Sequence, residues 1–265
     1  MKKVFLGLTT LMLLVMISTS CNNGDGEKKD AENKEATAPE ATTNASAEDT
    51  TGWITLFDGK DFTGWRGYDR TGVPKAWVIE DGAIKIQGSG EGEAGAKDGG
   101  DIIYDKKFKN FELSFEWKVS PGGNSGVFYL AQEVKGDPIW KSSPEYQILD
   151  NAKHPDAKLG KDGNRQSASL YDLIPAKPQN SKPAGEWNTG GIMVYKGTVV
   201  HKQNGENVLE YHLWTDDWKK MIENSKFKGW ENFINAGGPE HEGYIGLQDH
   251  GDDVWYRNIK IKILD

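Results

Sequence analysis

A strict alternation of apolar and polar residues over 111–119, with the sequence FELSFEWKV, constrains the fold of this chain more than any other feature. A period of two places successive side chains on opposite faces of an extended strand, so this segment is predicted to be a half-buried antiparallel strand. Its apolar side chains are expected to face the core, together with Ile259, Ile261 and Ile263 near the C-terminus.

Similar segments recur between clusters of Gly, Asn, Asp and Pro. Further strands are predicted at residues 127–132, 192–195, 198–201, 208–212, 244–248 and 254–263. The Asn204-Gly205 pair between two of them is typical of a tight hairpin, and only residues 216–227 look helical. The pattern predicts an all-β fold: a two-sheet antiparallel jelly-roll sandwich with one short helix.

The first twenty residues are typical of a lipoprotein signal peptide. Lys2 and Lys3 precede an apolar run over 4–17, which is too short to span a bilayer comfortably, and small residues follow at 18–20. Cys21, the only cysteine, comes directly afterwards, at the position where bacterial lipoproteins carry their lipid. Ordinary secretion with an incidental cysteine is the alternative. A single cysteine excludes an intrachain disulfide.

Residues 21–50 are predicted to be a lipidated, disordered tether, because positions 22–50 contain no aromatic residue and no Val, Ile or Leu. One domain is predicted over residues 51–265, which hold all ten tryptophans. The net charge of −8 and the lack of a basic cluster argue against a nucleic-acid partner. We expect the protein in the cell envelope, anchored to the membrane by its lipid, on the periplasmic or cell-surface side.

The segment 145–150, with the sequence EYQILD, places polar side chains in what is otherwise a buried strand. Glu145 and Gln147 are expected on one face, and Tyr146 and Ile148 on the other. Such a strand can pack against a core on one face and bind a polar ligand on the other.

Asp150 and His154 lie within ten residues of Glu145. Carboxylates with separated pKa values can serve as acid and base, and histidine is well matched to proton transfer near neutral pH. The alternative is structural, with Asp150 starting a turn and His154 exposed before Pro155.

Two more clusters carry candidate binding residues. If residues 170–172 form a strand, Tyr171 and Asp172 point to opposite faces, and an aromatic ring can stack on a sugar. Gln248 and His250 are expected to share a face, with Asp249 on the other, so both could line a concave surface.

The segment 250–253, His-Gly-Asp-Asp, could instead form a metal site in a loop, although Asp and Gly are also common in turns. No His-Glu-x-x-His, phosphate loop, dinucleotide fingerprint or Gly-x-Ser-x-Gly elbow is present in the sequence. These absences disfavour zinc proteases, kinases, NAD enzymes and serine hydrolases.

A series of motifs, in order from about Gly52 to Ile263, resembles the 3-keto-disaccharide hydrolase domain, a family frequent in Bacteroidota lipoproteins and formerly a domain of unknown function. The motifs are GWITLFDGK (52–60), GW (64–65), GDI (100–102), FELSFEW (111–117), GNSG (123–126), EYQILD (145–150), LYD (170–172), GEWN (185–188) and GLQDHG (246–251).

The resemblance implies a concanavalin A-like jelly roll that acts on glycosides already oxidised to a ketone at carbon 3. The ketone acidifies the hydrogen at carbon 2, so the group on carbon 1 can leave by elimination before water adds. This route needs a base near carbon 2, a donor or cation at the ketone oxygen, and an acid for the leaving group.

A weaker resemblance links the same strand to laminarinase-like glycoside hydrolases, which carry Glu-x-Asp-x-x-Glu with the first Glu as nucleophile and the last as acid/base. Here the spacing holds Glu145, Gln147 and Asp150. Because Gln147 cannot ionise, direct hydrolysis by two carboxylates is disfavoured.

The sequence therefore predicts an enzyme that cleaves the glycosidic bond of 3-keto glycosides; a carbohydrate-binding module and a conventional glucanase-like hydrolase are the alternatives. No cofactor is required by the sequence, and a divalent cation is compatible with it. The predicted catalytic residues are Glu145, Asp150 and His154, and the predicted substrate-binding residues are Gln147, Tyr171, Gln248 and His250.

Overall fold

A computed structural model of the chain describes residues 49–90 and 95–265. The predicted signal peptide, the lipid attachment at Cys21 and the tether up to residue 48 lie outside the described residues. Within the described ranges, no helix is both long and apolar enough to cross a membrane.

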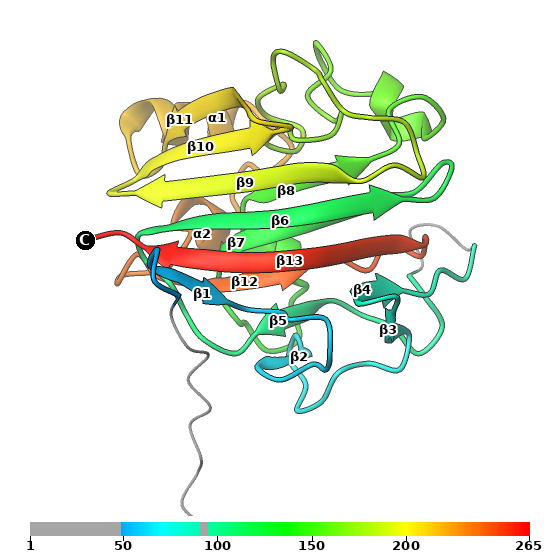
Figure 1. The fold of residues 1–265 in the computed structure, drawn as a ribbon. Helices are drawn as coiled ribbons and strands as arrows, with labels where there is room; N and C mark the ends of the chain where they lie inside the picture. The colour runs from blue at the N-terminus through cyan, green and yellow to red at the C-terminus, as the bar shows by residue number, and fades with distance from the viewer. Residues whose placement is uncertain (1–48, 91–94) are drawn as a thin grey trace, which may run out of the picture. The chain divides into compact units, whose positions relative to one another are not determined.

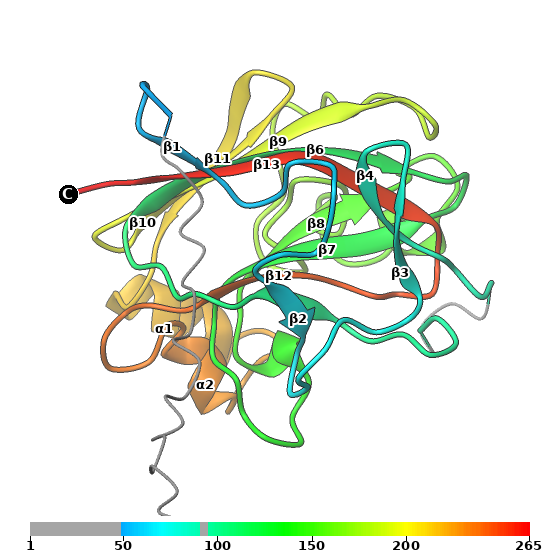
Figure 2. The ribbon, with the colours of Figure 1, turned by 60° about the horizontal axis from the view of Figure 1, so that its bottom comes forward.

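The domain is built from two antiparallel sheets stacked as layers (Figures 1 and 2). The large sheet has the order β11-β10-β9-β6-β13-β4-β3, with β1 also paired to β13. Its strands are β1 (Trp53–Thr55), β3 (Trp77–Glu80), β4 (Ala83–Ile86), β6 (Phe111–Val119), β9 (Asn188–Tyr195), β10 (Thr198–Gln203), β11 (Glu206–His212) and β13 (Val254–Ile263).

The small sheet has the order β2-β5-β12-β7-β8. Its strands are β2 (Trp65–Gly67), β5 (Ile102–Tyr104), β7 (Asn124–Ala131), β8 (Glu145–Leu149) and β12 (Tyr244–Leu247). Both sheets are antiparallel throughout, so the predicted two-sheet sandwich is confirmed.

Short helices lie on the side of the small sheet that faces away from the large one (Figure 2). α1 (Asp216–Glu223) starts where the sequence predicts and is capped by the Thr215 hydroxyl, which accepts a hydrogen bond from the Trp218 N–H. A second helix, α2 (Glu231–Ile234), was not predicted, because a single turn leaves no periodic pattern to detect. Two 3₁₀ turns, η2 (Ile139–Lys141) and η3 (Pro155–Lys158), complete the set in the described residues.

The alternation in β6 has its expected consequence, since Phe111, Leu113, Phe115 and Trp117 are all buried between the sheets. Ile259 and Ile261 of β13 are buried as well. The prediction for Ile263 is wrong: this side chain is 46% exposed, because it is the last residue of β13 and pairs with Phe111 at the end of the sandwich.

A buried chain of hydrogen bonds connects the two sheets. The Tyr129 hydroxyl of β7 lies 2.8 Å from His201 Nε2 of β10 and 2.6 Å from the Tyr211 hydroxyl of β11. His201 Nδ1 lies 2.9 Å from the Ala168 carbonyl oxygen, which can only accept, so Nδ1 carries the proton and Nε2 accepts from Tyr129. Burial lowers the pKa of His201 to about 4, which keeps the ring neutral.

Replacing this histidine tests the connection. His201→Phe keeps a ring but leaves the Ala168 carbonyl unpaired, so the free energy of unfolding should fall by about 1–3 kcal/mol in urea denaturation. The native His201 pKa lies below the unfolded value, so its contribution to stability is lost as pH falls from about 6.5 towards about 4, and the variant should lose less stability than the wild type over this window. His212→Phe, at a side chain 57% exposed, is the control; equal effects of the two substitutions would refute the role of the buried chain.

Candidate active site

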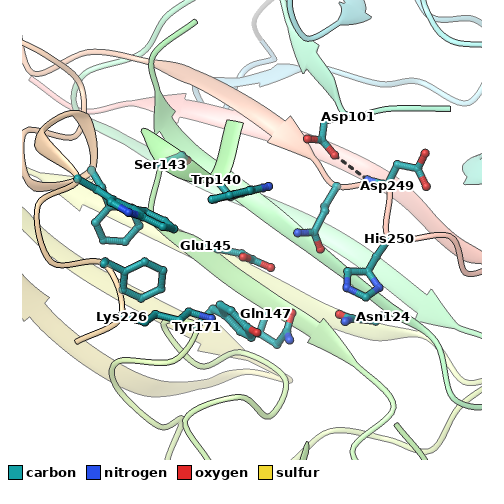
Figure 3. A pocket seen from close by; sticks show the side chains of 14 residues that line it. Asp101, Asn124, Trp140, Ser143, Glu145, Gln147, Tyr171, Lys226, Asp249 and His250 are labelled. Carbon is teal, nitrogen blue, oxygen red and sulfur yellow. Dashed lines mark hydrogen bonds between the residues drawn. The ribbon is translucent and has the colours of Figure 1, made fainter. Parts of the chain in front are cut away.

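A cavity of about 430 Å³ opens on the small sheet. It is lined by Asp101, Asn124, Trp140, Ser143, Glu145, Gln147, Tyr171, Lys226, Phe227, Trp230, Phe233, Gln248, Asp249 and His250 (Figure 3). Five of the seven site residues predicted from sequence are in this set: Glu145, Gln147, Tyr171, Gln248 and His250.

β8 divides its side chains as the alternation predicts. Glu145 and Gln147 line the cavity, whereas Tyr146 packs at 5.3 Å against Phe115 of the large sheet and donates a hydrogen bond to the Lys202 carbonyl. Gln147 is held by its own strand, because its side-chain oxygen accepts from the Ile148 N–H at 3.1 Å. One strand thus builds both the core and the cavity wall.

Glu145 is only 7% exposed, and within the described residues its carboxyl has no hydrogen bond or ion pair. Burial raises the pKa of this carboxyl to about 8, and the negative charges of Asp101 and Asp156 add to the rise. The nearby positive charge of Lys226 opposes it. Glu145 is therefore mostly protonated at neutral pH and can donate a proton.

Room for the Glu145 carboxyl comes from Gly126, its neighbour on β7, which pairs with Gln147. A Cβ atom at position 126 would overlap Oε1 of Glu145. The Gly-Asn-Ser-Gly segment thus has a role that the sequence does not reveal: its last glycine lets a carboxyl lie flat against the sheet.

Tyr171 lies in a turn rather than in the strand that the sequence analysis considered. Its hydroxyl donates to Asp156 at 2.9 Å, and Lys226 Nζ lies 4.2 Å from the centre of its ring. Asp172 does not line the cavity and forms ion pairs with Arg165 and Lys226. Tyr171 is therefore fixed at the cavity wall by charged neighbours.

The segment after β12 contributes Gln248, Asp249 and His250, all of which line the cavity. β12 ends at Leu247, and beyond it the Asp249 carboxylate is turned away from His250 (Figure 3). The Asp249 carboxylate accepts hydrogen bonds from the backbone N–H groups of Ala96, Gly100 and Gly251. Its own N–H donates to Asp101 at 2.9 Å.

Asp101 is a second carboxyl of the cavity with a raised pKa. Burial raises its pKa to about 7, and the hydrogen bond from the Asp249 N–H opposes the rise. At neutral pH this group is close to half ionised, so it can accept a proton. Asp101 and Glu145 are thus two carboxyls with raised pKa values within one cavity.

Asp150 does not line the cavity. It follows the end of β8, and its two carboxylate oxygens accept from the backbone N–H groups of Gly122 at 2.8 Å and Ala152 at 3.0 Å. This is the turn-forming arrangement that the sequence analysis held as the alternative.

His154 does not line the cavity, and its ring centre lies 6.0 Å from that of His250. Its Nδ1 accepts from the Asp156 N–H at 3.1 Å and caps η3. Burial and the neighbouring His250 lower the pKa of His154.

Among residues 49–90 and 95–265, His154, His250 and Asp252 form a group that could hold a metal, since their ligand atoms lie within 4.8 Å of one another. Two imidazoles and a carboxylate are common ligands of divalent transition metals. However, Asp252 accepts from the Asn124 N–H, and a neutral His154 that accepts at Nδ1 carries its proton on Nε2. A cation bound to His154 would have to displace either the proton on Nε2 or the hydrogen bond from the Asp156 N–H to Nδ1 that caps η3.

Sequence reasoning missed several cavity residues: Asp101, Asn124, Trp140, Ser143, Lys226, Phe227, Trp230, Phe233 and Asp249. Asp101, Asn124 and Asp249 lie in motifs that carry the family resemblance, so a signal for them existed. The aromatic residues 227–233 follow α1 and come to the site only through tertiary packing.

The fold and the site together define a β-sandwich protein with carboxyl, amide and aromatic side chains gathered in one cavity, equipment suited to a sugar ligand. Residues 52–262 match the 3-keto-alpha-glucoside-1,2-lyase-like domain, and the chain belongs to this family. The predicted family is thereby confirmed.

Individual relatives agree with this assignment. The chain is 55% identical over 290 residues to a 3-keto-disaccharide hydrolase of Bacteroides thetaiotaomicron, with both chains covered completely. A crystal structure of a proposed glycosyl hydrolase from Parabacteroides distasonis is 31% identical, with a TM-score of 0.70 over 82% of this chain and 96% of the other. A second from the same organism is 27% identical, with a TM-score of 0.60 over 80% and 99%.

Gly126→Ala should displace the Glu145 carboxyl from its buried position. Because burial causes the raised pKa, we expect it to fall from about 8 by at least about one unit, measured by ¹³C NMR titration of glutamate-labelled protein with Glu145→Gln for assignment. Gly72→Ala, where an added Cβ meets nothing within 4 Å, is the matched control. An unchanged Glu145 titration in Gly126→Ala would contradict the packing argument.

Asp150→Ala removes both acceptors of the turn after β8. The free energy of unfolding should fall by about 1–3 kcal/mol in urea denaturation, because two backbone N–H groups lose their partner. Asp150→Asn, which keeps one side-chain oxygen, should lose less. If folded Asp150→Ala binds or turns over a ligand of the cavity about a hundredfold less well, the predicted catalytic role of Asp150 stands instead.

Proposed function

We propose that this protein cleaves the glycosidic bond of 3-keto glycosides, 3-keto disaccharides among them. Support comes from the Bacteroides thetaiotaomicron relative, named a 3-keto-disaccharide hydrolase, and from a family described as 3-keto-alpha-glucoside-1,2-lyase-like. The observation that carries the proposal is the buried, unpaired Glu145 carboxyl, which is protonated at neutral pH inside the cavity.

The reaction proceeds by elimination and hydration. A base removes the proton from carbon 2, and the electron pair moves toward the ketone as an enolate. The enolate then expels the oxygen on carbon 1, which takes a proton and leaves as an alcohol, while a double bond forms between carbons 1 and 2. Water adds its hydroxyl to carbon 1 and a proton returns to carbon 2, giving the free 3-keto sugar.

Glu145 is the acid in this scheme. Its protonated carboxyl delivers a proton to the departing oxygen, a step that general acids accelerate by roughly 10²–10⁴-fold. The nearby charge of Lys226 stabilises the carboxylate that results, as its lowering effect on the pKa of Glu145 indicates.

Asp101 is the base at carbon 2, since a pKa of about 7 provides an ionised fraction at neutral pH without making the carboxylate a weak acceptor. His250 can donate to the ketone oxygen. Its Nδ1 is buried and unpartnered among the described residues, and an unpaired buried N–H is costly, so a neutral ring favours its proton on Nε2. Gln147, Gln248 and Tyr171 position the sugar.

We also propose that the protein is a lipoprotein, held to a membrane of the cell envelope through a lipid on Cys21. Support for this comes from the N-terminal sequence alone: a basic start, a short apolar run and a cysteine directly after small residues.

A direct experiment offers the protein a disaccharide and its 3-keto form and follows free glucose. Cleavage of the keto form alone is the expected result. Cleavage of the unoxidised form would point to an ordinary glycoside hydrolase that uses Asp101 and Glu145 as its carboxyl pair, and binding without cleavage to a carbohydrate-binding module. In D₂O, elimination and hydration place deuterium at carbon 2 of the released keto sugar, whereas direct hydrolysis leaves that hydrogen in place.

Glu145→Gln should lower turnover of the 3-keto disaccharide by at least about a hundredfold, because the amide cannot donate the proton. For the wild type, kcat/KM should fall as pH rises through about 8, where Glu145 loses its proton. Glu240→Gln, at an exposed position outside the cavity, serves as control. Near-normal turnover in Glu145→Gln would rule out Glu145 as the acid.

A further inference from the structure

The cavity has two chemically different ends (Figure 3). Asp101, Asn124 and His250 lie at one end, and Trp140 and Lys226 at the other. Glu145 lies between them (Figure 3). If the keto-sugar occupies the polar end, the group that departs from carbon 1 lies on the far side of Glu145, toward Trp140.

Four aromatic side chains build that second end. Trp140 belongs to η2, and its ring centre is 5.2 Å from that of Trp230. Phe227 lies 5.2 Å from Trp230 and is stacked on Phe233 at 4.6 Å, with 6° between their planes. Residues from two distant parts of the chain thus form one aromatic wall.

Trp140 is 39% exposed and is one of only three large apolar side chains exposed in the described part of the chain. An exposed indole at the rim of a ligand cavity commonly contacts the ligand. Its neighbour Trp230 is only partly exposed and packs against the core, so Trp140 is the ring most available for stacking.

The polar groups near this wall already have partners. The Ser143 hydroxyl donates to backbone oxygen, with the Tyr129 and Pro144 carbonyls each at 3.0 Å. Lys226 lies 3.4 Å from Asp172 and over the Tyr171 ring. The wall therefore offers mainly ring faces, and a flat aromatic group can bind through ring faces alone.

We propose that the wall of Trp140, Phe227, Trp230 and Phe233 is a binding site for an aromatic leaving group, which makes 3-keto aryl glycosides substrates of this protein. This inference rests on the proposed function. The bond between carbon 1 and the phenolic oxygen breaks after the carbon 2 proton is removed, the oxygen takes the proton of Glu145, and a phenol is released. Water then adds to the sugar as in the disaccharide reaction.

The test compares two substrates of the same anomeric configuration, the 3-keto derivatives of phenyl glucoside and of a glucose disaccharide. Trp140→Ala should lower kcat/KM for the phenyl compound by about tenfold, because the variant loses both the stacking contact and the apolar surface of the indole. The disaccharide should lose less than about threefold, and Trp140→Phe should restore most of the loss. Leu159→Ala, an exposed apolar residue outside the cavity, should change neither.

Equal losses for the two substrates, or no loss for the phenyl compound, would overturn the inference and leave the proposed function standing. If the wild type cleaves neither keto compound, the proposed function fails. Calorimetry with unoxidised phenyl glucoside then tests whether the aromatic wall binds an aromatic group, by comparing the affinity of the wild type with that of Trp140→Ala. Affinity weakened about tenfold in Trp140→Ala supports the site, and unchanged affinity refutes it.

Discussion

The burial of both faces of β8 is the constraint on which the site depends. Every residue of this strand is buried, and so is every residue of its neighbour β7. One face packs on the large sheet through Tyr146, and the other is covered by η2 and the segment around α2. A strand half open to water would leave Glu145 with an ordinary carboxyl pKa; the covered strand leaves Glu145 only 7% exposed, and this burial raises that pKa.

The alternation of apolar and polar residues predicts the structure correctly as far as the strands extend. The alternation in β6 and β8 was enough to predict two sheets and to place Glu145 and Gln147 on the face away from the core. It failed just beyond strand ends. Asp150 continues the spacing of a catalytic motif, but the strand stops at Leu149 and a turn begins, so the carboxylate bonds to backbone N–H groups instead of facing the cavity. Asp101 and the aromatic wall depend on contacts between distant segments, which no local pattern contains.

Asp249 shows how loop residues can be held as firmly as strand residues. Its carboxylate gathers N–H groups from two loops, and its own N–H fixes the Asp101 side chain. The polar end of the cavity is therefore positioned by hydrogen bonds to one carboxylate, while the aromatic end is positioned by ring packing. These supports are independent, so a substitution among the rings of the aromatic end can leave the hydrogen bonds of the polar end in place.

The last strand of the chain, β13, lies inside the large sheet, between β6 and β4, and also pairs with β1 (Figure 1). During synthesis, the segments that form these three neighbours emerge long before their shared partner exists. The large sheet can assemble fully only when the ten residues of β13 are available. Assembly of the large sheet thus waits for β13, and a chain cut before Val254 would leave β1, β4 and β6 without their shared partner.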